Sequence, residues 1–153
     1  MVDKAHPWSV EDTQSLKTLS VMDGTFNMPI SNKKHLRLYG HLLCPYVEKV
    51  RLVLAAKQLP YQDVQINLER RAKWHYLLNQ GFVPILETPS FGDSKHYMMF
   101  ESKIIMDFLD AKYPDAPLYS KDPFHRAEQD LMIHTFGEID RNLFFVLVSR
   151  GLH

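Results

Sequence analysis

The chain has 153 residues, which is enough for one domain or for one domain plus part of a second. Hydrophobic residues make up 45% of it and charged residues 24%, both ordinary values for a globular protein. The 18 basic and 18 acidic residues cancel, and this balance argues against a general nucleic-acid binder, which would carry a basic excess.

The sequence also limits where the protein can reside and whether it binds a metal. The N-terminal residues carry no apolar core of a secretory signal, and no apolar run reaches the length of a membrane span. Cys44 is the single cysteine, so an intrachain disulfide framework is excluded and a reducing compartment is favoured. The eight histidines show none of the spacings typical of a metal site. We therefore expect a cytoplasmic protein with no metal and no stable membrane span.

The first structured region is predicted to begin near His35. Residues 1–34 are polar and weakly periodic, so we expect a loosely ordered N-terminal extension there. Alternating apolar and polar residues then predict a strand over 35–41. Pro45 is typical of the first turn of a helix and opens a predicted helix over 45–58. This helix has one apolar stripe, formed by Val47, Val50, Val53 and Leu54.

Further along the chain, strands and helices are expected to alternate. The pattern predicts a strand at 64–68, a short helix at 69–78, a strand at 82–87, a hairpin loop at 88–95, a strand at 96–100 and a helix at 102–112. The inner face of the last of these helices is predicted to carry Ile104, Ile105, Phe108 and Leu109. The element order β-α-β-α-β-β-α over 35–113 indicates an α/β domain.

A linker at 114–122 leads to one long predicted helix. Asp122 and Pro123 suit the N-cap and first position of a helix. An apolar stripe at helical spacing follows, formed by Met132, Phe136, Ile139, Leu143 and Leu147. Because this stripe needs a partner, we interpret 123–153 as the start of an all-helical domain and expect the sequence to be a fragment or variant of a longer one.

Cys44 carries the clearest chemical signal. It lies between a predicted strand and a predicted helix, directly before Pro45. There the free N–H groups of the first helical turn and the helix dipole favour a thiolate, which attacks disulfides and electrophiles. The alternative is a buried, inert cysteine. Val47 stands where a second cysteine would complete a C-x-x-C pair, so an external thiol, such as glutathione, must resolve any mixed disulfide.

Two weaker signals accompany it. Proline in a strand suggests an edge or a cis bond, so the backbone of Val83 beside Pro84 is a candidate for pairing with an extended peptide ligand. Ser102 opens a helix and Glu101 precedes it, a pair that suits the carboxylate and ammonium of an amino acid head group. Each pattern is equally compatible with a plain structural role, an ordinary edge proline in one case and a plain helix cap in the other.

These residues together resemble a known family. The stretch LLCPYVEKVRLVLAAK at 42–57 closely resembles the active-site helix of omega-class glutathione transferases. Further matches follow in order at 66–68, 74, 83–87, 100–102, 108–110, 112–114 and 121–124, so that the likeness runs from about residue 36 to 129. It implies a thioredoxin-like N-terminal domain over 35–113, followed at 123–153 by the first helix of the all-α C-terminal domain.

The resemblance also implies a set of site residues. Cys44 would form a mixed disulfide with glutathione, with Tyr46 lining the pocket. Arg71 stands where the family has a lysine that faces the glycyl carboxylate. The family's activities are glutathione-dependent thiol transfer, reduction of dehydroascorbate and methylarsonate, and weak conjugation of electrophiles. The partners implied are therefore glutathione and small electrophilic or disulfide substrates, and a homodimer is compatible with the family.

The remaining contacts to glutathione would come from the backbone and from one helix start. Val83 would pair with the cysteinyl unit next to a cis Pro84, while Glu101 and Ser102 would hold the γ-glutamyl end. The turn at 79–82 is one residue shorter than in the family, the loop at 88–95 is longer, and most of the helical domain is missing. Two alternatives stay open: a non-catalytic glutathione-binding or dimerisation protein, and a chloride intracellular channel-like protein.

Overall fold

A computed structural model describes residues 18–21, 28–29, 34–89 and 97–149. The chain forms two compact units, residues 1–116 and 117–153. The predicted hairpin loop at 88–95 lies outside the described residues from position 90 onward, as do residues 1–17, 22–27 and 30–33 of the predicted extension.

The first unit is a mixed β-sheet covered by helices. Its strands are β1 (Leu19–Val21), β2 (Leu36–Gly40), β3 (Tyr61–Ile66), β4 (Ile85–Glu87) and β5 (Met98–Phe100), in the order β1-β3-β2-β4-β5. β1, β3 and β2 run parallel, whereas β4 and β5 are antiparallel to their neighbours. The helices are α2 (Pro45–Ala56), α3 (Lys73–Asn79) and α4 (Ser102–Lys112). The predicted order β-α-β-α-β-β-α from residue 35 is confirmed.

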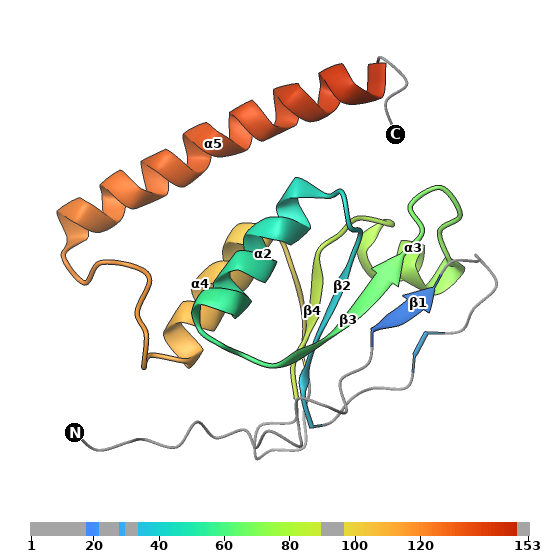
Figure 1. Cartoon of the computed structure of the whole chain (residues 1–153), viewed down its shortest axis with the longest axis horizontal. Helices are drawn as coiled ribbons and strands as arrows, with labels where there is room; N and C mark the ends of the chain where they lie inside the picture. Colours follow the sequence, from blue (N-terminus) through green and yellow to red (C-terminus); the bar gives the residue numbers. More distant parts are fainter. Residues whose placement is uncertain (1–17, 22–27, 30–33, 90–96, 150–153) are drawn as a thin grey trace. The chain divides into compact units, whose positions relative to one another are not determined.

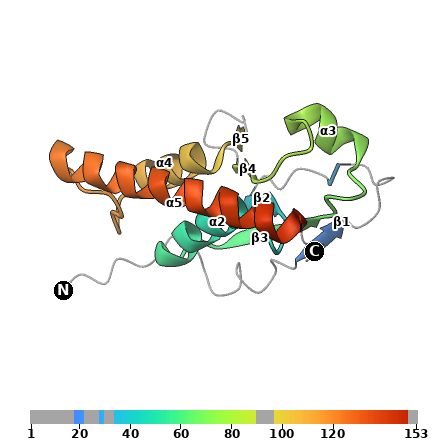
Figure 2. The same cartoon turned by 90° about the horizontal axis from the view of Figure 1, so that it is seen from above.

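The helices form two layers. Figure 1 shows α2 and α4 on one side of the strands and α3 on the other, and Figure 2 shows α3 well apart from both helices. The α2 side of the core holds Leu36, Leu38, Val47, Val50, Leu54, Ile105 and Leu109, all fully buried. The α3 side holds Tyr39, Val64, Ile66 and Ile85, with Trp74 packed against them. The predicted stripe on α2 is confirmed, but Ile104, expected inside, is 59% exposed.

The strand β1 lies in a region where the sequence predicts no fold element. Residues 1–34 were expected to hold no fold element, yet β1 pairs in parallel with β3, with Leu19 opposite Val64 and Val21 opposite Ile66. Leu19 packs against the core cluster on the α3 side. A three-residue strand is too short to give a periodic signal, and its pairing partner lies 45 residues away in the sequence.

Local hydrogen bonds explain the shifted element boundaries. The predicted helix at 69–78 begins only at Lys73, because Asn67 Oδ1 accepts hydrogen bonds from the backbone N–H of Glu69 (2.8 Å) and Arg70 (3.0 Å) and holds a turn there. For the same reason β3 ends at Ile66 and Leu68 lies outside it. The predicted helix at 45–58 ends at Ala56, since Gln58 has a φ of 52°.

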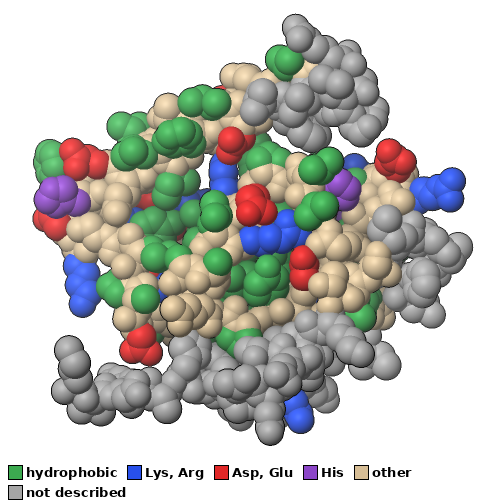
Figure 3. Space-filling model, in the orientation of Figure 1, with side chains coloured by type: hydrophobic (Ala, Val, Ile, Leu, Met, Phe, Trp, Pro, Cys, Tyr) green, Lys and Arg blue, Asp and Glu red, His purple; other side chains and the backbone are tan. Residues whose placement is uncertain are grey.

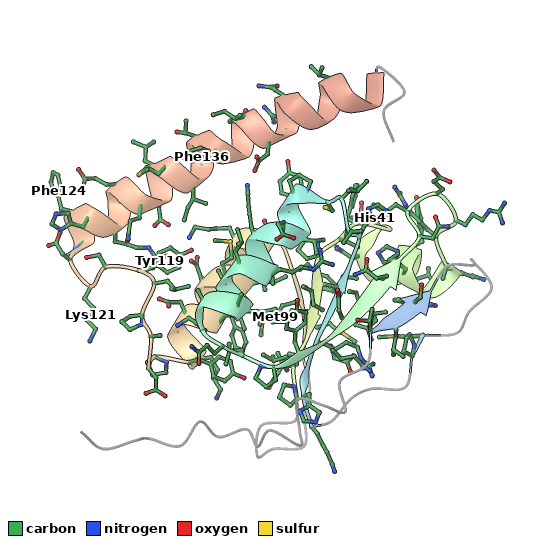
Figure 4. The ribbon with its side chains drawn as sticks, viewed as in Figure 1. His41, Met99, Tyr119, Lys121, Phe124 and Phe136 are labelled. Carbon is green, nitrogen blue, oxygen red and sulfur yellow. The ribbon has the colours of Figure 1, made fainter. Side chains whose placement is uncertain are left out.

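The second unit consists of a short lead-in and α5 (Pro123–Ser149). The predicted cap is confirmed, because the backbone N–H of His125 donates to Asp122 Oδ2 at 2.9 Å. Figure 3 shows hydrophobic side chains at the surface of α5, and Figure 4 shows Phe124 and Phe136 projecting from it. Met132, Phe136 and Ile139 of the predicted stripe are 60%, 56% and 54% exposed, whereas the side chains of Leu143 and Leu147 lie outside the description. Among the described helices, none is long and apolar enough to cross a membrane.

Candidate functional site

The sheet register brings three distant segments to one end of the first unit. Tyr39 of β2 lies opposite Ile85 of β4, which in turn lies opposite Phe100 of β5. Because β4 is antiparallel to both neighbours, the residues after β2, before β4 and after β5 share one end of the sheet. These residues are the turn to Cys44, the pair 83–84 and the pair 101–102, so the topology brings these three predicted parts of the site to the same end of the sheet.

Cys44 occupies the N-cap position of α2. Its backbone is extended (φ −88°, ψ 115°), and Pro45 is the first helical residue, as expected. The backbone N–H of Cys44 donates to the carbonyl of His41 at 3.2 Å, and its own carbonyl accepts from the N–H of Glu48 at 3.0 Å. The thiol is half-buried and makes no capping hydrogen bond. Cys44 is therefore the residue next to the free N–H groups of the first turn of α2, although its side chain bonds none of them.

His41, which no sequence pattern marks as a site residue, makes a hydrogen bond within the turn that leads into α2. The N–H of Leu43 donates to Nδ1 of His41 at 3.3 Å, and Figure 4 shows His41 between β2 and α2. Leu42 and Leu43 are 71% and 72% exposed, so this turn presents apolar side chains next to Cys44. A His two residues before a leucine in a turn carries no recognisable sequence signal.

Tyr46 and Arg71 stand on different elements around the site. Tyr46 is half-buried in the first turn of α2, with the Lys49 ammonium 5.3 Å from its ring centroid. Arg71 is exposed in the segment between β3 and α3, and its Nε donates to the Leu68 carbonyl at 2.9 Å. The Arg71 side chain lies over Gly81, where an added Cβ would come within 2.7 Å of Arg71 Cδ. Arg71 is therefore next to the turn that precedes residues 83–84.

The Val83–Pro84 peptide bond is cis, as the resemblance implies. The expectation of an edge strand is wrong, because β4 lies between β2 and β5. The backbone of Val83 is nonetheless available to a ligand, because the pairing of β4 with β2 begins only at Ile85. No hydrogen bond to the backbone of half-buried Val83 occurs within the described part of the chain.

Glu101 has an unusual backbone conformation at the start of α4. Its φ is 68° and its ψ is 114°, in a region that residues other than glycine rarely adopt. The predicted helix over 102–112 is confirmed, and Glu101 occupies its N-cap position without a capping hydrogen bond from its side chain. Ser102 is the first helical residue and is half-buried. Strained conformations of this kind cluster at ligand sites, where the surrounding structure holds them in place.

On the α3 side, a buried histidine that no sequence pattern marks contacts the backbone just before Val83. His75 is fully buried, and its Nε2 lies 2.9 Å from the carbonyl oxygen of Phe82. The Asn79 amide nitrogen donates to the same oxygen at 3.1 Å. Burial lowers the pKa of His75 below its ordinary value, and the positive charge of Arg71 lowers it further, while the hydrogen bond to Phe82 opposes both. A histidine inside a short helix gives no sequence signal for this contact.

The lowered pKa of His75 makes stability depend on pH. Below pH 6.5, the ordinary pKa of histidine, His75 is protonated in the unfolded chain but stays neutral in the folded one. The free energy of unfolding therefore decreases as the pH is lowered from 6.5 towards the pKa of His75 in the folded protein. We expect the wild type to lose stability between pH 7 and pH 5 more steeply than His75→Phe, as measured by urea unfolding at each pH. Parallel pH profiles for the two proteins would contradict this expectation.

Comparison with known proteins shows which family has a similar sequence. Residues 38–117 match the model of the glutathione S-transferase N-terminal domain. The chain is 35% identical over 105 residues to glutathione S-transferase omega-2 from Homo sapiens, covering 68% of this chain and 41% of that protein. It is 40% identical over 105 residues to pyrimidodiazepine synthase from Drosophila melanogaster, covering 68% and 42%. The chain thus spans about two fifths of the length of these curated relatives.

A solved structure gives the same result for the fold. The crystal structure of Chlamydomonas reinhardtii dehydroascorbate reductase superposes with a TM-score of 0.51 at 25% sequence identity, covering 60% of this chain and 45% of that one. The predicted thioredoxin-like domain and the predicted similarity to omega-class proteins are confirmed by these matches.

Proposed function

Because the chain belongs to the glutathione S-transferase family, we propose that it binds glutathione and forms a mixed disulfide with it at Cys44. The observation that carries this proposal is the sheet register, which gathers the α2 N-terminus, the backbone of Val83 and the strained Glu101 at one end of the first unit. A tripeptide thiol needs a thiol partner, a backbone to pair with and a site for its charged ends, and these three segments supply them.

Each part of glutathione has a candidate partner. The backbone of Val83, ahead of the ladder, would pair with the cysteinyl unit next to the buried Pro84. At the start of α4, the Glu101 carboxylate would face the γ-glutamyl ammonium, and Ser102 would hold the carboxylate beside it. Arg71 would attract the glycyl carboxylate from its place over Gly81. Tyr46, in the first turn of α2, would line the pocket near the sulfur.

The chemistry that these residues support is thiol transfer. The Cys44 thiolate attacks the glutathione sulfur of a disulfide R–S–S–G, the S–S bond breaks, and R–S⁻ leaves and takes a proton. A glutathione thiolate then attacks the mixed disulfide at its glutathione sulfur, forming oxidised glutathione and returning Cys44 as a thiolate. The net result is R–S–S–G + GSH → R–SH + GSSG: the R sulfur is reduced to a thiol, and one free glutathione thiol is oxidised as it joins the glutathione that was already in the disulfide. The helix N-terminus stabilises the negative sulfur at both stages.

The acceptor is the finer part of the proposal. Dehydroascorbate would take two electrons and two protons while two glutathione molecules become one disulfide. The similarity to a dehydroascorbate reductase supports this acceptor, and methylarsonate is a second candidate from the omega-class resemblance. The name of the Drosophila relative indicates that this fold also serves a different reaction. A homodimer and a cytoplasmic location remain part of the proposal.

The decisive test follows the single cysteine. After incubation with oxidised glutathione, intact mass should show one glutathionyl adduct on the wild type and none on Cys44→Ala. Iodoacetamide should alkylate Cys44 several-fold faster in the folded protein than in the same protein unfolded in urea, because only the folded state offers the helix N-terminus. A wild type without an adduct would overturn the mechanism. An adduct without turnover on dehydroascorbate would instead support the alternative of a non-catalytic glutathione binder.

A further inference from the structure

The backbone just before the cis bond is held by side chains from α3. The carbonyl oxygen of Phe82 accepts from His75 Nε2 (2.9 Å) and Asn79 Nδ2 (3.1 Å). Both donors belong to a helix whose own end folds back on the same turn, since the N–H of Gly81 donates to the carbonyl of His75 at 3.3 Å. The Phe82 carbonyl therefore has two side-chain donors in fixed positions.

The tautomer of His75 follows from its surroundings. A carbonyl oxygen can only accept, so Nε2 carries the proton and Nδ1 is left as a bare acceptor. Nδ1 is buried and has no hydrogen-bond partner in the described part of the chain. The ring of Trp74 lies beside it, with 5.6 Å between the ring centroids. An apolar ring would fill this fully buried position without an unpaired nitrogen, so the contact with Phe82 is the feature that distinguishes histidine here.

The direction of the Phe82 carbonyl fixes the direction of the next N–H. The Phe82–Val83 peptide is trans, because the described cis bond is the following one. In a trans peptide the C=O and N–H bonds lie in the same plane and point in opposite directions. When His75 and Asn79 hold the carbonyl of Phe82 towards α3, the N–H of Val83 must point away from α3. This is the N–H that the proposed function assigns to the cysteinyl unit of glutathione.

We propose that His75, together with Asn79, is a positioning residue that sets the Phe82–Val83 peptide plane and so presents the Val83 N–H to the ligand. This inference rests on the proposed function. Neither side chain touches the reacting sulfur, so the contribution is to binding and orientation and not to the chemical step. Phe82 itself is 61% exposed, so its side chain is not packed in the interior, and the two hydrogen bonds hold its carbonyl.

A matched pair of variants separates the hydrogen bond from packing. His75→Phe keeps a ring of similar size but removes the donor, whereas His75→Gln can place an amide N–H near the position of Nε2. S-methylglutathione, which cannot form a disulfide, is the probe in isothermal titration calorimetry. We expect roughly three- to tenfold weaker binding for His75→Phe, near wild-type binding for His75→Gln, and an unchanged iodoacetamide rate at Cys44 in both. Asn79→Ala, which removes the second donor, should weaken binding in the same direction and serves if His75→Phe does not fold.

Three outcomes would overturn the inference. Wild-type binding of S-methylglutathione by His75→Phe would show that the hydrogen bond from His75 to the Phe82 carbonyl is irrelevant. Equal losses of affinity in His75→Phe and His75→Gln would indicate a packing role alone. Long-range ¹H–¹⁵N correlation spectra of the free protein should show the Nε2–H tautomer of His75. An Nδ1–H tautomer would leave no proton on Nε2 to donate to the Phe82 carbonyl and would overturn the inference regardless of the binding results. Failure of the wild type to bind S-methylglutathione, with the Nε2–H tautomer present, would instead count against the proposed function on which this inference rests.

Discussion

Replacing Arg37 with methionine is expected to lower the free energy of unfolding by about 3–5 kcal/mol, because the carboxylate of Glu87 then loses its buried cation. Arg37 is 4% exposed and Glu87 is 0% exposed, and the two side chains meet at 3.1 Å between Nη1 and Oε2. The hydroxyl of Tyr39 also donates to Oε2 at 2.7 Å. Methionine preserves much of the volume, so the loss reports mainly on charge.

An exposed pair in the same unit is the matched control. Lys103 and Asp107 of α4 meet at 2.7 Å with side chains 37% and 40% exposed, and breaking such a surface pair costs about 1 kcal/mol or less. Urea unfolding of Arg37→Met, Lys103→Met and the double variant Arg37→Met with Glu87→Gln measures all three. The double variant should recover part of the loss, since the buried charge is gone. Equal destabilisation by Arg37→Met and Lys103→Met would contradict the argument.

This cluster shows what local patterns could not predict. Alternation in residues 35–41 predicts the strand β2 correctly, but it does not reveal that both of its faces are buried. Arg37 donates a hydrogen bond from Nε to Gln62 Oε1 on β3 at 2.8 Å and another from Nη1 to Glu87 Oε2 on β4. These partners lie 25 and 50 residues away in the sequence. Pairing across such distances depends on the order of strands in the sheet, which a single sequence does not encode locally.

In the candidate site, too, the sequence predicts some features and not others. Cys44 before Pro45 was placed correctly because a strand, a turn and a helix start follow from nearby residues. The left-handed backbone of Glu101 was not foreseen, since that conformation is imposed on a residue that does not favour it. The contact between His75 and the Phe82 carbonyl was missed because it depends on how the end of α3 folds back.

A second large loss of stability is expected from Lys57→Met. The Lys57 ammonium is buried with its side chain 1% exposed, and it lies 2.7 Å from Asp110 Oδ1. It also donates to the carbonyls of Tyr113 (2.7 Å) and Ala116 (2.8 Å), so all its three donors are used. Removing the ammonium takes the cation away from the Asp110 carboxylate and from the carbonyls of Tyr113 and Ala116. We expect the free energy of unfolding to fall by about 3–5 kcal/mol, as measured by urea unfolding.

The same variant separates stability from chemistry. Lys57 follows the last residue of α2, whereas Cys44 precedes the first, so a 12-residue helix of about 18 Å lies between them. At a temperature where Lys57→Met is still folded, its glutathionyl adduct and its iodoacetamide rate should equal those of the wild type. Lys73→Met, at an exposed position on α3, should change neither stability nor reactivity. If folded Lys57→Met failed to form the adduct, the thiol chemistry would depend on the far end of α2 as well, and the local account of Cys44 would be wrong.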